Sequence, residues 1–247
     1  MLFNSLHFLV FFPVVLVLYF VLPRRAKLIM LLGASYYFYM CWKAEYAVLI
    51  LASTLVDYFA ALRMSHLPDR KGRGKYLLLS VLVNLGMLFG FKYLNFFNES
   101  VRDFLALFQV DYSVPALRVL LPVGISFYTF QTMGYTIDVY RGDKEAERSF
   151  LIFALYVSFF PQLVAGPIER SRRLLPQFHQ ERKVDFRRLV DGFGLILWGY
   201  YMKLVVADQI APYVNRVYGD PAMYTGGHYI VATVLFAWQI FCDFAGY

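Results

Sequence analysis

Long apolar runs are the feature that most limits what this chain can fold into. A bilayer core about 30 Å thick takes roughly 17–25 helical residues to cross. We interpret six runs as spans: Leu6–Leu22, Leu28–Trp42, Tyr46–Leu62, Tyr76–Phe97, Leu189–Ile210 and Tyr229–Tyr247. Helices are expected, because a spanning segment must satisfy its own backbone hydrogen bonds. The sequence therefore predicts an all-α, polytopic transmembrane protein.

Composition supports a membrane protein and argues against a nucleic-acid partner. The chain is 60% hydrophobic and 17% charged, whereas soluble domains carry about 25% charged residues. Its net charge of +7 comes from basic residues in short loops, where they suit anionic lipid headgroups. We expect the lipid bilayer as a partner and no nucleic acid. With no internal repeat and no long linker, residues 1–247 are interpreted as one membrane domain.

Cysteines and histidines give no sign of a disulfide or a metal site. Cys41 and Cys242 lie in different apolar stretches, and the four histidines are scattered without metal-ligand spacing. We expect no bound metal and no bound cofactor.

Two further segments are apolar but interrupted, Leu120–Tyr140 and Phe150–Pro167. Irregular backbone at membrane depth persists only where protein or a water-filled cavity surrounds it. We therefore expect broken or re-entrant segments in the fold. The residues expected to break them are Pro122, Gly124, Pro161, Gly166 and Pro167.

Loop charges predict the topology. The pair Arg24-Arg25 follows the first apolar run, which indicates an uncleaved anchor with its N-terminus outside. If both interrupted segments spanned, the basic stretch Arg170–Arg188 would fall outside, against the positive-inside rule. We favour Phe150–Pro167 as the segment that is re-entrant or lies flat. This choice also leaves Arg141, Lys144 and Arg148 inside.

Polar residues in the segment after Pro122 share one helical face. Tyr128, Gln131, Tyr135 and Asp138 recur at i, i+3, i+7 and i+10. Thr129, Thr132 and Thr136 make a second stripe beside them. Such a wide polar face predicts a cavity wall, and the alternative is hydrogen bonding between helices that only holds the bundle together.

The last run carries a second polar set. Gln239, Asp243 and Tyr247 fall at i, i+4 and i+8, so Asp243 needs a donor, a wet cavity or a neighbouring helix. Lys92 and Lys203 can snorkel to an interface, and Asp57 can be neutralised by an adjacent helix. Ser126 and Gln162 complete the candidates for a tunnel or substrate lining.

Five stretches of the sequence resemble the membrane-bound O-acyltransferase family, in its bacterial alginate O-acetylase branch. They are LLGASYYFYMCW at 31–42, FKYLNFF at 91–97, LPVGISFYTFQTMGYTIDVYRGD at 121–143, FFPQLVAGPIER at 159–170 and FCDFAGY at 241–247. The resemblance implies a ring of helices around a thin core with a tunnel, in the bacterial cytoplasmic membrane. It also implies a cytoplasmic acyl donor, typically acetyl-coenzyme A, and an extracytoplasmic polysaccharide or partner protein as acceptor.

The sequence departs from the family's pattern in one respect. The family's catalytic histidine lies in a Trp-His motif downstream of the Asp-Phe-(Ser/Ala)-Gly-Tyr stretch, and that motif is absent from these 247 residues. We therefore expect the N-terminal half of a longer protein, inactive by itself, and assign no catalytic residue here. D-alanyl transfer to teichoic acid, a transporter or flippase, and a scaffold subunit remain as alternatives.

Overall fold

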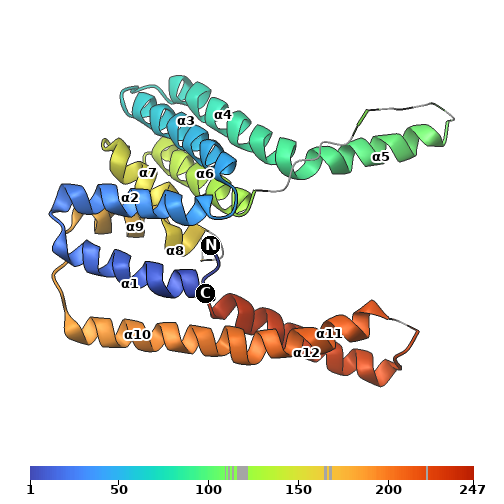
Figure 1. Cartoon of the computed structure of the whole chain (residues 1–247). Helices are drawn as coiled ribbons and strands as arrows, with labels where there is room; N and C mark the ends of the chain where they lie inside the picture. The colour runs from blue at the N-terminus through green and yellow to red at the C-terminus, as the bar shows by residue number, and fades with distance from the viewer. Residues whose placement is uncertain are drawn as a thin grey trace. The chain divides into compact units, whose positions relative to one another are not determined.

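The computed structural model describes residues 1–108, 110, 112, 114–115, 122–163, 166, 169–220 and 222–247. Every regular element in these ranges is a helix, which confirms the predicted all-α class (Figure 1). The α-helices are α1 Leu6–Val21, α2 Arg24–Met40, α3 Ala47–Ser65, α4 Arg70–Leu88, α5 Leu94–Ala106, α6 Ile125–Arg141, α7 Phe150–Ser158, α8 Phe160–Leu163, α9 Ser171–His179, α10 Phe186–Tyr200, α11 Asp208–Gly219 and α12 Gly226–Ala245. A 3₁₀ turn, η1 Ala44–Tyr46, precedes α3, and π-helical turns η2 Phe89–Tyr93 and η3 Tyr201–Ala207 join α4 to α5 and α10 to α11.

These helices form two compact units. Unit 1 holds residues up to 163 together with 169–181, and unit 2 holds residues 182–247. The single membrane domain expected from the sequence stays a prediction, because compactness is a different property from sharing one bilayer.

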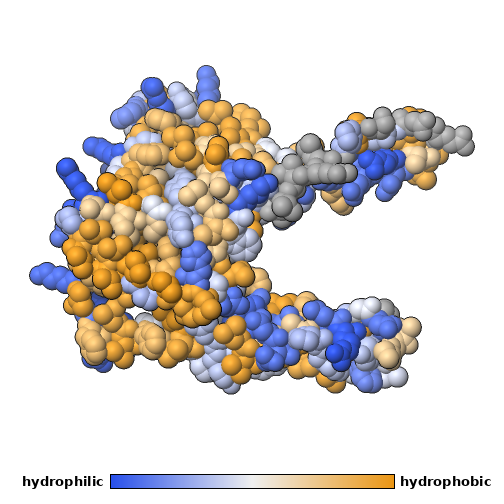
Figure 2. Space-filling model, in the orientation of Figure 1, coloured by the Kyte–Doolittle hydropathy of each residue, from blue (hydrophilic) through white to orange (hydrophobic). Residues whose placement is uncertain are grey.

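Four helical stretches are long and apolar enough to cross a membrane: Ala44–Ser65, Arg70–Ala106, Phe186–Gly219 and Gly226–Ala245. They contain three of the six predicted spans in full and the fourth, Tyr229–Tyr247, as far as Ala245. The other two predicted spans are helical but shorter, with 16 residues in α1 and 17 in α2. Large apolar side chains cover much of the visible surface (Figure 2), and Leu6 and Leu195 are 82% and 73% exposed. Such a surface fits contact with lipid rather than with water.

A buried polar network joins α3, α4 and α6, which pack against one another in unit 1. Asp57 of α3 is fully buried. Its carboxylate accepts hydrogen bonds from Ser80 Oγ, from Asn84 Nδ2 at 2.9 and 3.0 Å, and from Thr136 Oγ1 at 3.3 Å. Thr132 Oγ1 lies 3.5 Å from Asn84 Oδ1. Donors on neighbouring helices therefore satisfy the hydrogen-bonding capacity of the Asp57 carboxylate. Two of the three threonines in the second stripe, Thr132 and Thr136, form hydrogen bonds between helices. This is the alternative in which polar side chains hold the bundle together.

The segment predicted to be interrupted is broken at Phe159. α7 has nine residues, which span about 14 Å at 1.5 Å per residue, less than half of a bilayer core. Phe159 leaves the helical region with φ −55° and ψ 111°, two residues before the expected break at Pro161. Pro161 lies in the first turn of α8, where its missing N–H is not needed for a helical hydrogen bond.

A glycine sets the start of α6. Gly124 has a left-handed backbone with φ +76°, and a Cβ there would collide with the carbonyl oxygen of Leu163. Only glycine allows both the turn and the close approach to the end of α8. Pro122 precedes this turn, and its carbonyl accepts from the Ile125 N–H at 3.2 Å. Of the other expected breaks, Gly166 lies at a bend, and Pro167 is outside the described residues.

Unit 2 is built on α10, η3, α11 and α12. α12 packs against both η3 and α11. Its end approaches α10 so closely that a Cβ on Gly199 would lie 2.5 Å from the Gly246 carbonyl oxygen. Lys203 Nζ lies 3.0 Å from an Asp208 oxygen and 2.5 Å from an Asp243 oxygen. Asp243 therefore has its donor, and Lys203 pairs with acids, which the snorkelling interpretation did not anticipate.

Candidate functional site

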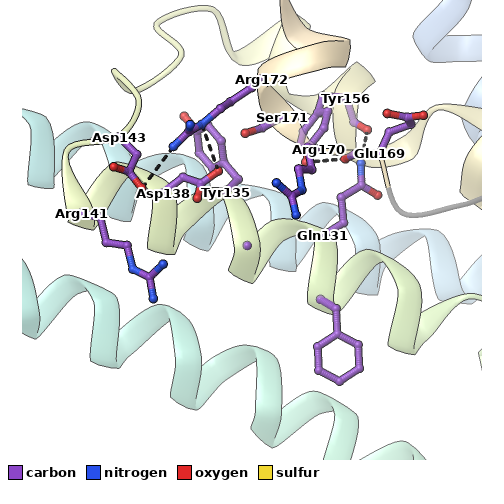
Figure 3. Close-up of a pocket in the computed structure, with 12 residues that line it drawn as sticks. Gln131, Tyr135, Asp138, Arg141, Asp143, Tyr156, Glu169, Arg170, Ser171 and Arg172 are labelled. Atoms are coloured by element: carbon purple, nitrogen blue, oxygen red, sulfur yellow. Dashed lines mark hydrogen bonds and ion pairs between the residues drawn. The ribbon is translucent and has the colours of Figure 1, made fainter.

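A cavity of about 380 Å³ lies in unit 1, beside the second half of α6 (Figure 3). Its walls are one face of α6, the loop that follows α6, Tyr156 of α7, and the residues that lead into α9. The lining residues are Phe130, Gln131, Gly134, Tyr135, Asp138, Arg141, Asp143, Tyr156, Glu169, Arg170, Ser171 and Arg172.

The α6 wall contains three of the four residues that the helical spacing grouped: Gln131, Tyr135 and Asp138. Hydrogen bonds fix two of them. Gln131 Nε2 donates to the carbonyl oxygen of Tyr156 at 2.9 Å, and the Tyr135 hydroxyl accepts from the backbone N–H of Glu147 at 2.8 Å. The polar face therefore borders the cavity and also ties α6 to its neighbours.

The α9 wall is joined to α6 by ion pairs. Arg172 Nη2 lies 3.1 Å from an oxygen of Asp143, and Arg172 Nε lies 4.0 Å from an oxygen of Asp138 (Figure 3). Gly142 ends α6 in a left-handed conformation with φ +80°, which turns the chain so that Asp143 faces α9. Arg172 thus holds the first turn of α9 against the end of α6.

Lys144 provides a second link between these elements. Its Nζ donates to the carbonyl oxygen of Ser171 at 2.8 Å. Burial lowers the pKa of the Lys144 ammonium to about 8, although the Glu147 and Asp138 carboxylates act in the opposite direction.

The cavity has acids and bases in equal number, but they are not evenly paired. Asp138 and Asp143 are matched by Arg172. No ion pair joins Arg141 or Arg170 to an acid in the described part of the chain. Two guanidinium groups at the cavity are therefore available to an anionic ligand.

Comparison with known proteins covers the whole chain. The chain is 37% identical to the probable alginate O-acetylase AlgI of Azotobacter vinelandii and 36% identical to the protein of the same name from Pseudomonas aeruginosa. It is 29% identical to the peptidoglycan O-acetyltransferase of Helicobacter pylori. Each alignment includes 100% of this chain.

These relatives are members of the membrane-bound O-acyltransferase family, and this chain is homologous to them along its full length. It spans about half the length of these relatives: 49%, 47% and 52% respectively. No family profile matches the chain, and no solved structure matches it.

Two of the five stretches that resemble the family supply most of the cavity wall. Residues 121–143 include the α6 face, and residues 159–170 lead to Glu169 and Arg170. The sequence did not single out Arg170, Ser171 or Arg172 as site residues. A signal was available, because three arginines occur within four positions just after an interrupted apolar segment.

The other candidates in unit 1 lie outside the cavity lining. Tyr128 is buried, and its hydroxyl has no hydrogen-bond partner among the described residues. Gln162 Nε2 donates to the Tyr156 carbonyl oxygen at 2.8 Å. Ser126 is half-buried in the first turn of α6.

The candidates of the last run all lie in unit 2. Asp243 pairs with Lys203. Gln239 lies on the same helix, α12, and Tyr247 follows the end of that helix. Their expected role as a tunnel lining stays a prediction.

Histidines and acids form no metal centre in the described ranges, where no group of three or more suitable ligands occurs. His179 instead pairs with Glu147, at 2.8 Å between Nε2 and a carboxylate oxygen. This pair fastens the end of α9 to the loop that leads into α7.

Proposed function

We propose that this chain forms the donor-side part of an O-acyltransferase that moves an acetyl group from cytoplasmic acetyl-coenzyme A to an extracytoplasmic polysaccharide. The observation that carries the proposal is the cavity between α6 and α9, lined by two family stretches and bordered by arginines. The named activities of the relatives, alginate O-acetylase and peptidoglycan O-acetyltransferase, support acetyl transfer to a polysaccharide.

The chemistry at this wall is binding and orientation. The basic residues Arg141, Lys144 and Arg172 lie at the end of α6 that the loop charges assign to the cytoplasm, whereas Arg170 lies beside Gln131 and Tyr156 (Figure 3). Buried Gln131 and Tyr156 lie further along the cavity, so a ligand entering there passes from a charged mouth to a polar wall with one further arginine, Arg170. This order suits a donor with an anionic head and a small acyl group.

The test uses the longest form of the protein that contains this chain, in membrane vesicles from the bacterial cytoplasmic membrane. Acetyl-coenzyme A carrying a radiolabelled acetyl group is supplied on the cytoplasmic face. We expect labelled polysaccharide on the opposite face. Arg172→Gln should lower the rate at least about tenfold, because it frees the α9 wall from Asp138 and Asp143.

Arg173→Gln is the matched control, since Arg173 is exposed on the same helix and does not line the cavity. It should keep the wild-type rate. Movement of unmodified acceptor across the membrane without acetylation would support a transporter instead. Transfer of D-alanine but not acetyl would replace the proposed acyl group, and equal rates in Arg172→Gln and wild type would remove this cavity from the reaction.

A further inference from the structure

The first turn of α9 is a helix N-terminus that opens on the cavity. α9 has nine residues, no side chain caps its start, and no acid lies in its first turn. Its first two residues, Ser171 and Arg172, both line the cavity. Unsatisfied N–H groups at a helix start, together with the helix dipole, favour an anion.

A buried hydroxyl at this helix start points to a missing partner. Ser171 is only 2% exposed and lines the cavity, yet its Oγ has no hydrogen-bond partner among the described residues. Buried polar groups are nearly always paired, so an unpaired one calls for an explanation. A ligand oxygen bound in the cavity would supply that partner.

The charges around the helix start favour the same kind of ligand. Arg172 is already paired with Asp143 and Asp138, which leaves the Arg170 and Arg141 guanidinium groups without an acid in the described ranges. Glu169 is the remaining acid of the lining, and its carboxylate points away from the Arg170 guanidinium (Figure 3). Lys144 adds a cation bonded to the Ser171 carbonyl oxygen.

We propose that the start of α9, with Ser171 and Arg170, is a phosphate-binding site. A phosphate offers several oxygens at once to guanidinium groups, a hydroxyl and backbone N–H groups. The identity of its occupant rests on the proposed function: it is a phosphate group of the coenzyme A donor. The other source of the same chemistry is the headgroup of an anionic phospholipid, which the experiment separates.

The experiment measures equilibrium binding to the longest form of the protein, held in phosphatidylcholine nanodiscs. The probes are coenzyme A, dephospho-coenzyme A and pantetheine, which carries no phosphate. We expect coenzyme A to bind more tightly than pantetheine. Arg170→Gln should weaken coenzyme A binding about tenfold, and Ser171→Ala should weaken it by a smaller factor. Neither change should affect pantetheine.

Arg173→Gln again serves as the control, because it removes the same charge from α9 outside the cavity. Its coenzyme A affinity should equal that of the wild type. Thermal unfolding of each variant separates loss of the site from loss of the fold. If Arg170→Gln has the wild-type melting temperature and binds coenzyme A ten times more weakly, the site itself was changed.

A second arm uses nanodiscs that contain phosphatidic acid and measures retained lipid by mass spectrometry. Loss of phosphatidic acid in Arg170→Gln, with coenzyme A binding unchanged, assigns the phosphate to a lipid headgroup. Unchanged binding of both ligands overturns the proposal.

Acetyl transfer from acetyl-pantetheine tells this proposal apart from the proposed function. Transfer that proceeds equally in wild type and Arg170→Gln, without any preference for phosphate-bearing ligands, would leave the acyltransferase standing and remove the phosphate site. Tight binding of coenzyme A without any acyl transfer would support the phosphate site and contradict the proposed acyltransferase.

Discussion

Burial brings the pKa of Lys144, beside the cavity, closer to neutral pH. The charged groups around it are the Glu147 and Asp138 carboxylates and the Arg172 guanidinium. Because burial lowers the pKa of Lys144 to about 8, its ammonium loses a proton as the pH rises through that value. The loss removes a positive charge next to the start of α9.

Coenzyme A affinity should therefore fall as the pH rises from 7 to 9. The phosphate is already ionised over that range, since its second pKa is about 6. Lys144→Arg, whose guanidinium stays charged, should abolish the fall. Binding isotherms at several pH values test this prediction, and a fall of the same size in Lys144→Arg would show that another group is responsible.

Gly199 and Gly246 bring two stretches of unit 2 into backbone contact. A Cβ on Gly199 would lie 2.5 Å from the Gly246 carbonyl oxygen, and a Cβ on Gly246 would lie 2.9 Å from that of Gly199. Both contacts are with backbone, which cannot rotate away as a side chain can.

Gly199→Ala should destabilise the protein by about 1–3 kcal/mol through overpacking. Gly194→Ala on the same helix is the matched control, because a Cβ there meets nothing within 4 Å. That change should be neutral or slightly stabilising, since alanine favours helix over glycine. Thermal unfolding in detergent measures both, and equal melting temperatures would contradict the close approach.

At the scale of elements, the network around Asp57 holds α3, α4 and α6 together. Asp57→Ala would remove the acceptor that Ser80, Asn84 and Thr136 share, although Asn84 and Thr136 also donate to backbone carbonyl oxygens of their own helices. We expect a loss of at least about 1–3 kcal/mol, and a smaller loss for Asp57→Asn, which keeps one acceptor oxygen.

Thr54→Val is the control for this prediction. Thr54 is also fully buried on α3, but its hydroxyl donates only to the Ile50 carbonyl oxygen of its own helix. Its unfolding free energy should change little, because that carbonyl keeps its backbone bond. Denaturant titrations compare the three variants, and a Thr54→Val loss as large as that of Asp57→Ala would mean that the network has no special role.

The elements were predictable where the cause is local. Apolar length located the helices that contain Tyr46–Leu62 and most of Tyr229–Tyr247, and glycine chemistry marked the turn at Gly124. The break at Phe159 was placed two residues too late, because nothing in Phe159 itself forbids a helix. Phe159 lies between α7 and α8, which both pack against α2, and such tertiary contacts are not visible in the sequence alone.

The site was half predictable for a similar reason. A 3.6-residue period puts Gln131, Tyr135 and Asp138 on one face, and that face does line the cavity. The opposite wall comes from residues more than thirty positions further along the chain, such as Arg170 and Arg172. No periodicity links two segments across such a loop.

For the whole molecule, the loop charges predict one orientation. Residues 142–149 should face the cytoplasm, and α5 should end outside. Single cysteines test this after the natural Cys41 and Cys242 are replaced by serine. Glu145→Cys should react with a membrane-impermeant maleimide only in inverted vesicles. Glu99→Cys should react only in intact cells in which the envelope outside the cytoplasmic membrane has been made permeable.

Both positions are exposed, so access within the fold does not limit labelling. Labelling of both from the same side would reject the orientation. Such a result would also mean that the mouth of the cavity does not face the compartment that supplies the proposed donor.

The network around Asp57 also bears on how the chain is assembled during synthesis. Asp57, Ser80 and Asn84 lie 23 and 27 positions apart on two consecutive helices. The acid therefore finds donors as soon as α3 and α4 have both been made, before the threonines of α6 emerge. An acidic residue is costly in lipid when it is alone, but this hairpin can enter the bilayer with the Asp57 carboxyl group already hydrogen-bonded to its own hydroxyl and amide groups. α6 can then dock onto a pair that is complete without it.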